Sequence, residues 1–139
     1  MGTEWYITAF ENKEEQNISV EKLMKIFSEY IIQKSMNYNS IDLELDSGII
    51  SIYFDFSKDA TSNLMISRPI IDKKLNEILY KTMRLGNFIL FTSDGNYSIV
   101  LDKKIKNEFP NDMIEVLGTP KIAENEMEFA LLLAKLYEA

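Results

Sequence analysis

Four carboxylates lie within a short segment in which acidic and apolar residues alternate. The segment, residues 40–56, reads SIDLELDSGIISIYFDF and carries Asp42, Glu44, Asp46 and Asp55. Carboxylates can bind Mg²⁺, exchange protons in catalysis or attract a basic protein. Alternate residues of a strand lie about 6.5 Å apart, so the first three of these side chains do not converge on one ion without further ligands. The pattern therefore favours either a docking surface for a basic protein or an ordinary solvated sheet face.

The residue types that most often carry out catalysis are missing from the chain. It contains no Cys and no His. This excludes Ser-His-Asp and Cys-His catalysis, disulfides and zinc sites built on Cys, and it removes the commonest transition-metal ligand. The sequence SDGN, with Asp94 and Gly95 at its centre, lacks the spaced acidic ligands of a calcium loop and is typical of a turn. We expect no enzymatic activity, no cofactor and no bound metal.

Acidic residues outnumber basic ones, mainly in the first half of the chain. The net charge is −7, from 22 Asp and Glu against 15 Lys and Arg. Residues 1–60 hold 11 acids and five lysines, a charge of −6, whereas residues 61–139 hold 11 acids and ten bases, a charge of −1. Such a field repels nucleic acid and anionic lipid and attracts a basic partner. The expected partner is therefore a basic protein, and neither nucleic acid nor a membrane.

The chain shows no pattern that would direct it to or across a membrane. No apolar run approaches the roughly 18 residues that a membrane helix needs. The first 15 residues, MGTEWYITAFENKEE, lack a basic segment followed by an apolar one, which predicts no secretory signal. The absence of Cys fits a reducing compartment, so the expected location is the cytoplasm.

The alternation in residues 40–56 predicts a β-hairpin with one buried face and one wet face. A two-residue turn at Ser47-Gly48 would place residues whose numbers add to 95 opposite each other. The apolar pairs would then be Leu45–Ile50, Leu43–Ile52 and Ile41–Phe54. The wet face would pair Asp46 with Ile49, Glu44 with Ser51 and Asp42 with Tyr53. The expected partner-binding surface consists of Asp42, Glu44, Asp46, Tyr53 and Asp55.

The remaining patterns predict one α+β domain over residues 1–139. Its sheet is expected to be mostly antiparallel, with about five strands and three helices in the order β-α-β-β-(β)-α-β-β-α. Besides the hairpin at 40–56, the expected strands are 4–10, an optional strand at 64–67, and a second hairpin, 87–102, in which Leu90 pairs with Ile99. Both faces of this second hairpin are apolar, which predicts central strands that are covered on both sides.

Apolar stripes with helical spacing predict the three helices. The first, 19–34, has Ser19 as its N-cap, and the second, 68–86, has Pro69 in its first turn. The third, 123–139, is apolar nearly all round, which predicts deep packing. Residues 113–117 fit either a strand or one helical turn. The expected buried faces contain Ile71, Leu75, Ile78, Leu79 and Met83 in the second helix and Met127, Ala130, Leu131, Ala134 and either Leu136 or Tyr137 in the third.

One segment resembles a known class of proteins. It reads MISRPIIDKKLNEILYKTMRLGNFILFTSDGN, with an Arg-Pro, an amphipathic helix, a Gly-Asn and a strand that ends in a turn. Over residues 64–101 it resembles small bacterial immunity proteins of contact-dependent growth inhibition and related polymorphic-toxin systems. The resemblance implies a cytoplasmic inhibitor that binds one cognate toxin domain, often a basic nuclease, and covers its active site.

Two other classes of function also fit the sequence. A small acidic α+β chain that ends in a helix also fits a secretion chaperone or adaptor, which would form a homodimer and bind an effector segment in exposed apolar grooves. An enzyme would need a site built from carboxylates or Lys, and the sequence locates none.

Overall fold

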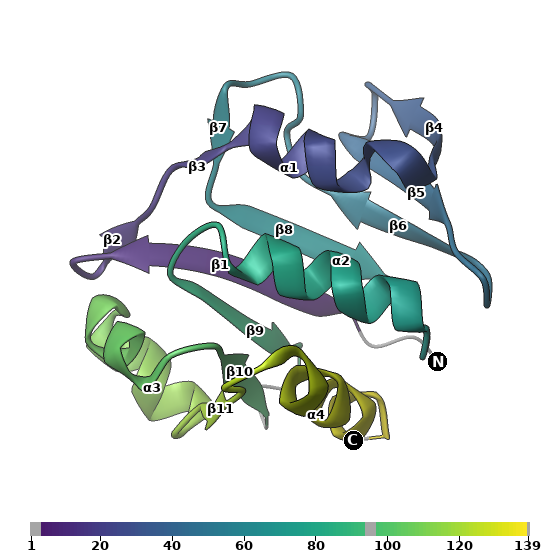
Figure 1. Ribbon diagram of the computed structural model, residues 1–139. Helices are drawn as coiled ribbons and strands as arrows, with labels where there is room; N and C mark the ends of the chain where they lie inside the picture. Colours follow the sequence, from purple (N-terminus) through teal and green to yellow (C-terminus); the bar gives the residue numbers. More distant parts are fainter. Residues whose placement is uncertain (1–3, 94–96, 139) are drawn as a thin grey trace.

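The computed structural model describes residues 4–93 and 97–138. It consists of a curved sheet with helices packed against it (Figure 1). The strands are β1 (Trp5–Glu11), β2 (Glu14–Glu15), β3 (Ile18–Ser19), β4 (Ile31–Ser35), β5 (Ser40–Glu44), β6 (Ile49–Tyr53), β7 (Ala60–Thr61), β8 (Asn63–Ser67), β9 (Phe88–Thr92), β10 (Ser98–Val100) and β11 (Lys121–Ile122). The helices are α1 (Val20–Phe27), α2 (Lys73–Met83), α3 (Asn111–Leu117) and α4 (Glu126–Glu138), with 3₁₀ turns η1 (Ser28–Tyr30) and η2 (Lys103–Glu108).

The main sheet is mostly antiparallel, as the sequence predicts. Its strand order is β11-β10-β9-β1-β8-β6-β5-β4, with β2 beside β1, and β3 pairs separately with β7. Only β10 and β11 run parallel among the described strands. The α+β class is therefore confirmed. The described residues form nine strands in this sheet and four α-helices besides the two 3₁₀ turns, more than the five strands and three helices expected.

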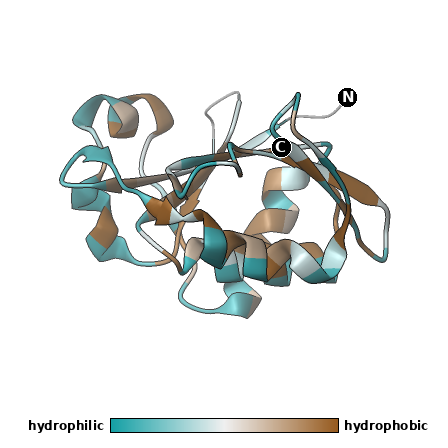
Figure 2. Ribbon diagram, turned by 90° about the horizontal axis from the view of Figure 1, so that it is seen from above, coloured by the Kyte–Doolittle hydropathy of each residue, from teal (hydrophilic) through white to brown (hydrophobic). Residues whose placement is uncertain are grey.

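Most of the core lies between one face of the sheet and the helices. Helix α2 packs between α1 and α4, and Figure 2 shows these helices gathered on one side of the curved sheet. Trp5 and Ile7 of β1 and Leu75 of α2 are buried in this layer. Each fully buried side chain of this size stabilises the fold by about 1.5–3 kcal/mol. The opposite face of β8, β6 and β5 carries no helix in the described structure (Figure 2).

The first helix is shorter than its apolar stripe predicts. Ser19 caps it as expected, because its Oγ accepts the N–H of Lys22 at 3.2 Å, but α1 ends at Phe27 and residues 31–35 form strand β4. The β-branched pair Ile31-Ile32 favours a strand, and pairing with β5 outweighs the helical spacing. Strand β5, which carries the alternating acids, therefore lies inside the sheet and not at its edge.

The second and third predicted helices begin later than expected and expose residues that the sequence predicts to be buried. Helix α2 begins at Lys73 with Asp72 as N-cap, so Pro69 and Ile71 precede it, and Ile71 is 56% exposed. Helix α4 buries Phe129, Leu133 and Leu136, whereas Met127 and Leu131 face outward. When a helix is apolar nearly all round, its sequence periodicity does not show which side is buried.

A second, smaller core covers the other face at one end of the sheet. The predicted pairing of Leu90 with Ile99 is confirmed, and both side chains lie in the main core. The neighbouring residues Ile89 and Val100 point the other way and pack with Phe109 beneath α3 and η2. Residues 113–117 are helical and belong to α3. The predicted turn at Asp94-Gly95 lies outside the described residues.

Candidate docking surface

The hairpin that carries the acids forms with the predicted faces but a different register. Leu43 lies opposite Ile50 and Asp42 lies opposite Ser51, a shift of two residues from the prediction. A four-residue loop, 45–48, replaces the two-residue turn, and the N–H of Leu45 donates to the carbonyl oxygen of Gly48 at 2.8 Å. Side chains alternate with a period of two, so a shift of two leaves each residue within β5 and β6 on its predicted face. The expected burial of Leu43, Leu45, Ile50 and Ile52 is confirmed.

Two of the predicted acids, Asp42 and Glu44, lie on the sheet face that the helices leave open. Ser51 Oγ donates a hydrogen bond to Asp42 Oδ1 at 2.7 Å, which uses part of the hydrogen-bonding capacity of this half-buried carboxylate. Glu44 is exposed and makes no hydrogen bond or ion pair within the described part of the chain. Neither carboxylate is paired with Lys or Arg there, so both charges are available to a partner.

The other two predicted acids lie at the ends of the hairpin and are held by local contacts. Asp46, in the loop after β5, forms an ion pair with Lys74 of α2 at 3.2 Å and therefore lies toward the helix layer. Asp55 follows β6 and accepts hydrogen bonds from the hydroxyl and the N–H of Ser57, at 2.6 and 3.3 Å. The Ser57 hydroxyl is the main cause that lowers the pKa of Asp55, and Lys58 adds to the effect. Of the four expected acids, Asp42 and Glu44 are thus the two that lie on the open face without an ion pair in the described structure.

The fifth predicted residue, Tyr53, belongs to a row of large side chains that crosses the open face. Tyr53 lies opposite Met65, Met65 opposite Tyr6, and Tyr6 opposite Phe91, all half-buried. We call these four side chains the aromatic row. The rings of Tyr6 and Phe91 are stacked, with centroids 5.6 Å apart and planes inclined by 24°. Three strand spacings separate the ends of the row, so it extends about 14 Å across the sheet.

The open face is acidic and free of basic side chains among its described strand residues. Glu15 of β2 lies opposite Phe10 and so belongs to the same face, where its Oε1 accepts a hydrogen bond from Asn63 Nδ2 at 3.3 Å. The registers of β1, β5, β6, β8 and β9 place no Lys or Arg on this side. Carboxylates thus flank a half-exposed apolar centre, which is the arrangement that charge-complementary recognition uses.

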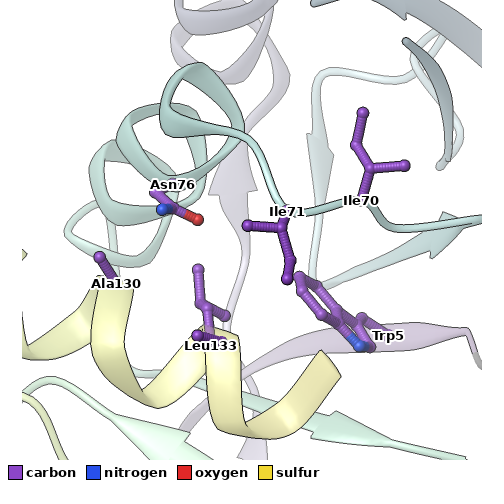
Figure 3. Close-up of a pocket in the computed structure, with 7 residues that line it drawn as sticks. Trp5, Ile70, Ile71, Asn76, Ala130 and Leu133 are labelled. Carbon is purple, nitrogen blue, oxygen red and sulfur yellow. The ribbon is translucent and has the colours of Figure 1, made fainter. Parts of the chain in front are cut away.

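Two hollows elsewhere do not have the character of a catalytic site. Figure 3 shows one, a crevice of about 20 Å³ between α2 and α4, in which Ile71 lies near Trp5 and Asn76 faces α4. A space of this size holds about one water molecule and no substrate. The other, about 270 Å³ between α1 and α2, is lined by Lys25, Glu29, Glu77 and Lys81, whose opposite charges compensate each other. Residues 4–93 and 97–138 contain no group of three acidic side chains placed to hold a metal ion.

No protein-family model, curated protein or solved structure matches the chain. No helix within the described ranges combines the length and the apolar character that crossing a bilayer requires.

Proposed function

We propose that the protein is an immunity protein that binds a cognate toxin domain and neutralises it by covering the toxin's active site. The observation that carries the proposal is the pair of carboxylates without an ion pair, Asp42 and Glu44, beside the aromatic row on an open sheet face whose described strand residues include no Lys or Arg. The expected toxin domain is basic, as many nucleases are, because it must complement a chain of net charge −7. Such an inhibitor acts in the cytoplasm and needs no catalytic residues, cofactor or metal of its own.

Charge and apolar contact contribute to such an interface in different ways. Acidic groups at the rim of an interface raise the association rate and disfavour acidic partners, whereas buried aromatic anchors supply most of the affinity. The open face contains both: Glu15, Asp42 and Glu44 supply the charge, and Tyr53 and Tyr6 supply amphipathic rings of the type enriched at interfaces. A basic nuclease active site, which is shaped to attract phosphate, is the kind of surface that such a face would cover.

The proposal predicts that a gene beside this one encodes a toxin domain, and the direct test is protection of cells that express that domain. Wild-type protein should restore growth, and the double variant Asp42→Lys, Glu44→Lys should lose most of that protection. The matched control is Glu126→Lys, Glu138→Lys, which changes the net charge equally but places it on exposed positions of α4, across the sheet. Both double variants should unfold at nearly the same temperature as wild type, because all four side chains are exposed or half-buried. A neighbouring toxin gene whose product the wild-type protein fails to neutralise would refute the proposal.

A secretion chaperone is the second candidate, and one observation favours it. Helix α4 exposes a row of apolar side chains, with Met127 at 76% and Leu131 at 61% exposure. A chaperone is expected to form a homodimer in which such a row is covered. The molecular mass in solution therefore distinguishes a chaperone from an immunity protein. Analytical ultracentrifugation at micromolar concentration should give a monomer for the immunity protein, and a stable dimer would favour the chaperone.

A further inference from the structure

The open face continues into a groove beneath helix α3. Its apolar lining includes Phe10, Phe91 and Val116, and its volume is about 390 Å³. Phe91 lines this groove and is also the last member of the aromatic row, so the row and the groove adjoin, and we call the two together the trough. Starting from Tyr53 beside β5, the trough crosses β8, β1 and β9 and ends against α3.

The groove is held in place by packing below and by hydrogen bonds at one end. Phe10 meets Phe109 edge to face, with ring centroids 5.8 Å apart, and both belong to the second core. The turn between β1 and β2 is tied to the segment before α3 through Lys13, whose N–H donates to the carbonyl oxygen of Glu108 at 2.7 Å. Lys13 Nζ also donates to Asn111 Oδ1 at 2.6 Å. These contacts place α3 beside the sheet edge before any partner arrives, which lowers the ordering cost of binding.

The exposed rim of the groove combines an apolar side chain with acidic ones. Val116 is 76% exposed although it lines the groove, and Asp112 lies at the same rim without an ion pair in the described residues. The exposed Glu115 is the other charged residue of α3, and the helix has no Lys or Arg. The described residues that line the groove include no Lys or Arg, although Lys13 donates to the neutral Asn111 of α3 and so keeps its charge nearby. The groove therefore favours an apolar side chain that is accompanied by positive charge.

We propose that the aromatic row and the α3 groove form one docking trough for a basic protein segment, which places an aliphatic or aromatic side chain in the groove. Lys or Arg side chains of that segment face Asp112 at one end of the trough and Asp42 and Glu44 at the other. This proposal rests on the proposed function and identifies the part of the toxin domain that is recognised: an apolar residue flanked by bases. It also extends the docking surface well beyond the acids of β5.

The absence of Cys from the chain allows a clean footprinting test. Val116→Cys places a thiol at the groove, and Met127→Cys places one on α4, at a position that is equally exposed, 76% in each case. The rate of alkylation by a fluorescent maleimide is measured with and without saturating amounts of the toxin domain encoded by the neighbouring gene. Binding should slow alkylation at position 116 at least about tenfold and at position 127 by less than about twofold.

An affinity measurement with a second pair of variants completes the test. Val116→Lys, which places a base in the groove, should weaken binding of the toxin domain at least about tenfold, whereas Met127→Lys should leave it within about twofold. A toxin domain that binds and is neutralised while position 116 stays fully reactive and Val116→Lys binds normally would overturn the docking trough and leave the proposed function standing. A toxin domain that does not bind the wild-type protein would overturn both.

Discussion

Replacing Asp72 with Ala should destabilise the protein by about 2–4 kcal/mol, because this carboxylate joins two elements at once. Asp72 is 3% exposed, and its Oδ1 accepts the N–H groups of Lys74 and Leu75 at 2.7 and 3.2 Å, which caps α2. Its Oδ2 accepts the N–H of Ser47 at 2.8 Å, which fixes the loop between β5 and β6.

The magnitude follows from the two sets of contacts. Loss of an Asp N-cap costs about 0.5–2 kcal/mol, and an N–H left without a partner, here that of Ser47, costs about 1–3 kcal/mol. Asp72→Asn keeps an oxygen for the cap but presents an amide N–H toward Ser47. Its cost should therefore be smaller, about 1–3 kcal/mol. The control is Asp59→Asn, because Asp59 is exposed and its carboxylate makes no hydrogen bond among the described residues.

The effect of Asp72 should also depend on pH in a defined direction. Burial alone would raise the pKa of Asp72, but the hydrogen bonds from the N–H groups of Ser47, Leu75 and Lys74 and from the Ser47 hydroxyl outweigh it and lower the pKa below its usual 3.8. A lowered pKa in the folded state means that the stabilisation is present above about pH 4 and is lost as the pH falls through the folded-state value.

Urea unfolding of wild type, Asp72→Ala and Asp72→Asn at pH 7 and pH 3 measures all of these quantities. The free-energy difference between wild type and Asp72→Asn should shrink at pH 3. A cost below about 0.5 kcal/mol for Asp72→Ala at pH 7, or a difference that stays constant with pH, would refute the reasoning.

Three further substitutions test the packing by the same unfolding measurement. Leu43→Ala, at a side chain with no exposed surface, should cost about 2–5 kcal/mol, and a cost below about 1 kcal/mol would place Leu43 outside the core. Gly86→Ala should cost about 1–3 kcal/mol, because the added Cβ would collide with Ile18 Cδ1 and lie 2.7 Å from Gln16 Oε1. This Gln16 oxygen accepts the hydrogen bond of the Asn87 N–H. An unchanged stability would show that the Ile18 and Gln16 side chains move aside without cost. Ser98→Ala should leave stability unchanged or raise it by about 1 kcal/mol, because the buried Ser98 Oγ has no hydrogen-bond partner in the described structure. A clear loss of stability would contradict this and indicate that the hydroxyl makes an interaction.

The sequence could predict which face each hairpin residue occupies but not the pairing between the strands. Alternation of Leu43 and Glu44 identifies the buried and wet sides whatever the register, because a shift of two residues leaves the sides unchanged. The register depends on the length of the loop, and Ser47-Gly48 fits a two-residue turn as well as the end of the four-residue loop that the structure has. The predicted two-residue turn keeps Asp46 in the strand and on the wet face, whereas in the four-residue loop it forms an ion pair with Lys74 of the helix layer.

The larger part of the candidate surface depends on which strands become neighbours. Tyr6, Tyr53, Met65 and Phe91 come from four segments that are far apart in the chain, and no local pattern indicates that β1 lies between β8 and β9. The sequence does not indicate the end of α1 for a related reason, since Ile31 continues a helical stripe but pairs with Leu43 of β5. Long-range strand pairing decided both cases, and a single sequence contains little information about it.

The association rate of the protein with the toxin domain of the neighbouring gene, measured at low and high salt, tests the central claim most directly. The claim is that Asp42 and Glu44 on the open sheet face attract a basic partner. Wild type and the α4 control variant Glu126→Lys, Glu138→Lys should associate rapidly at low salt and several-fold more slowly at about 0.5 M salt, where charges are screened beyond a few ångströms. Asp42→Lys, Glu44→Lys should associate at least about tenfold more slowly at low salt and show a weaker dependence on salt. Equal rates and equal salt dependence for all three proteins would contradict the claim and leave this face as a solvated surface.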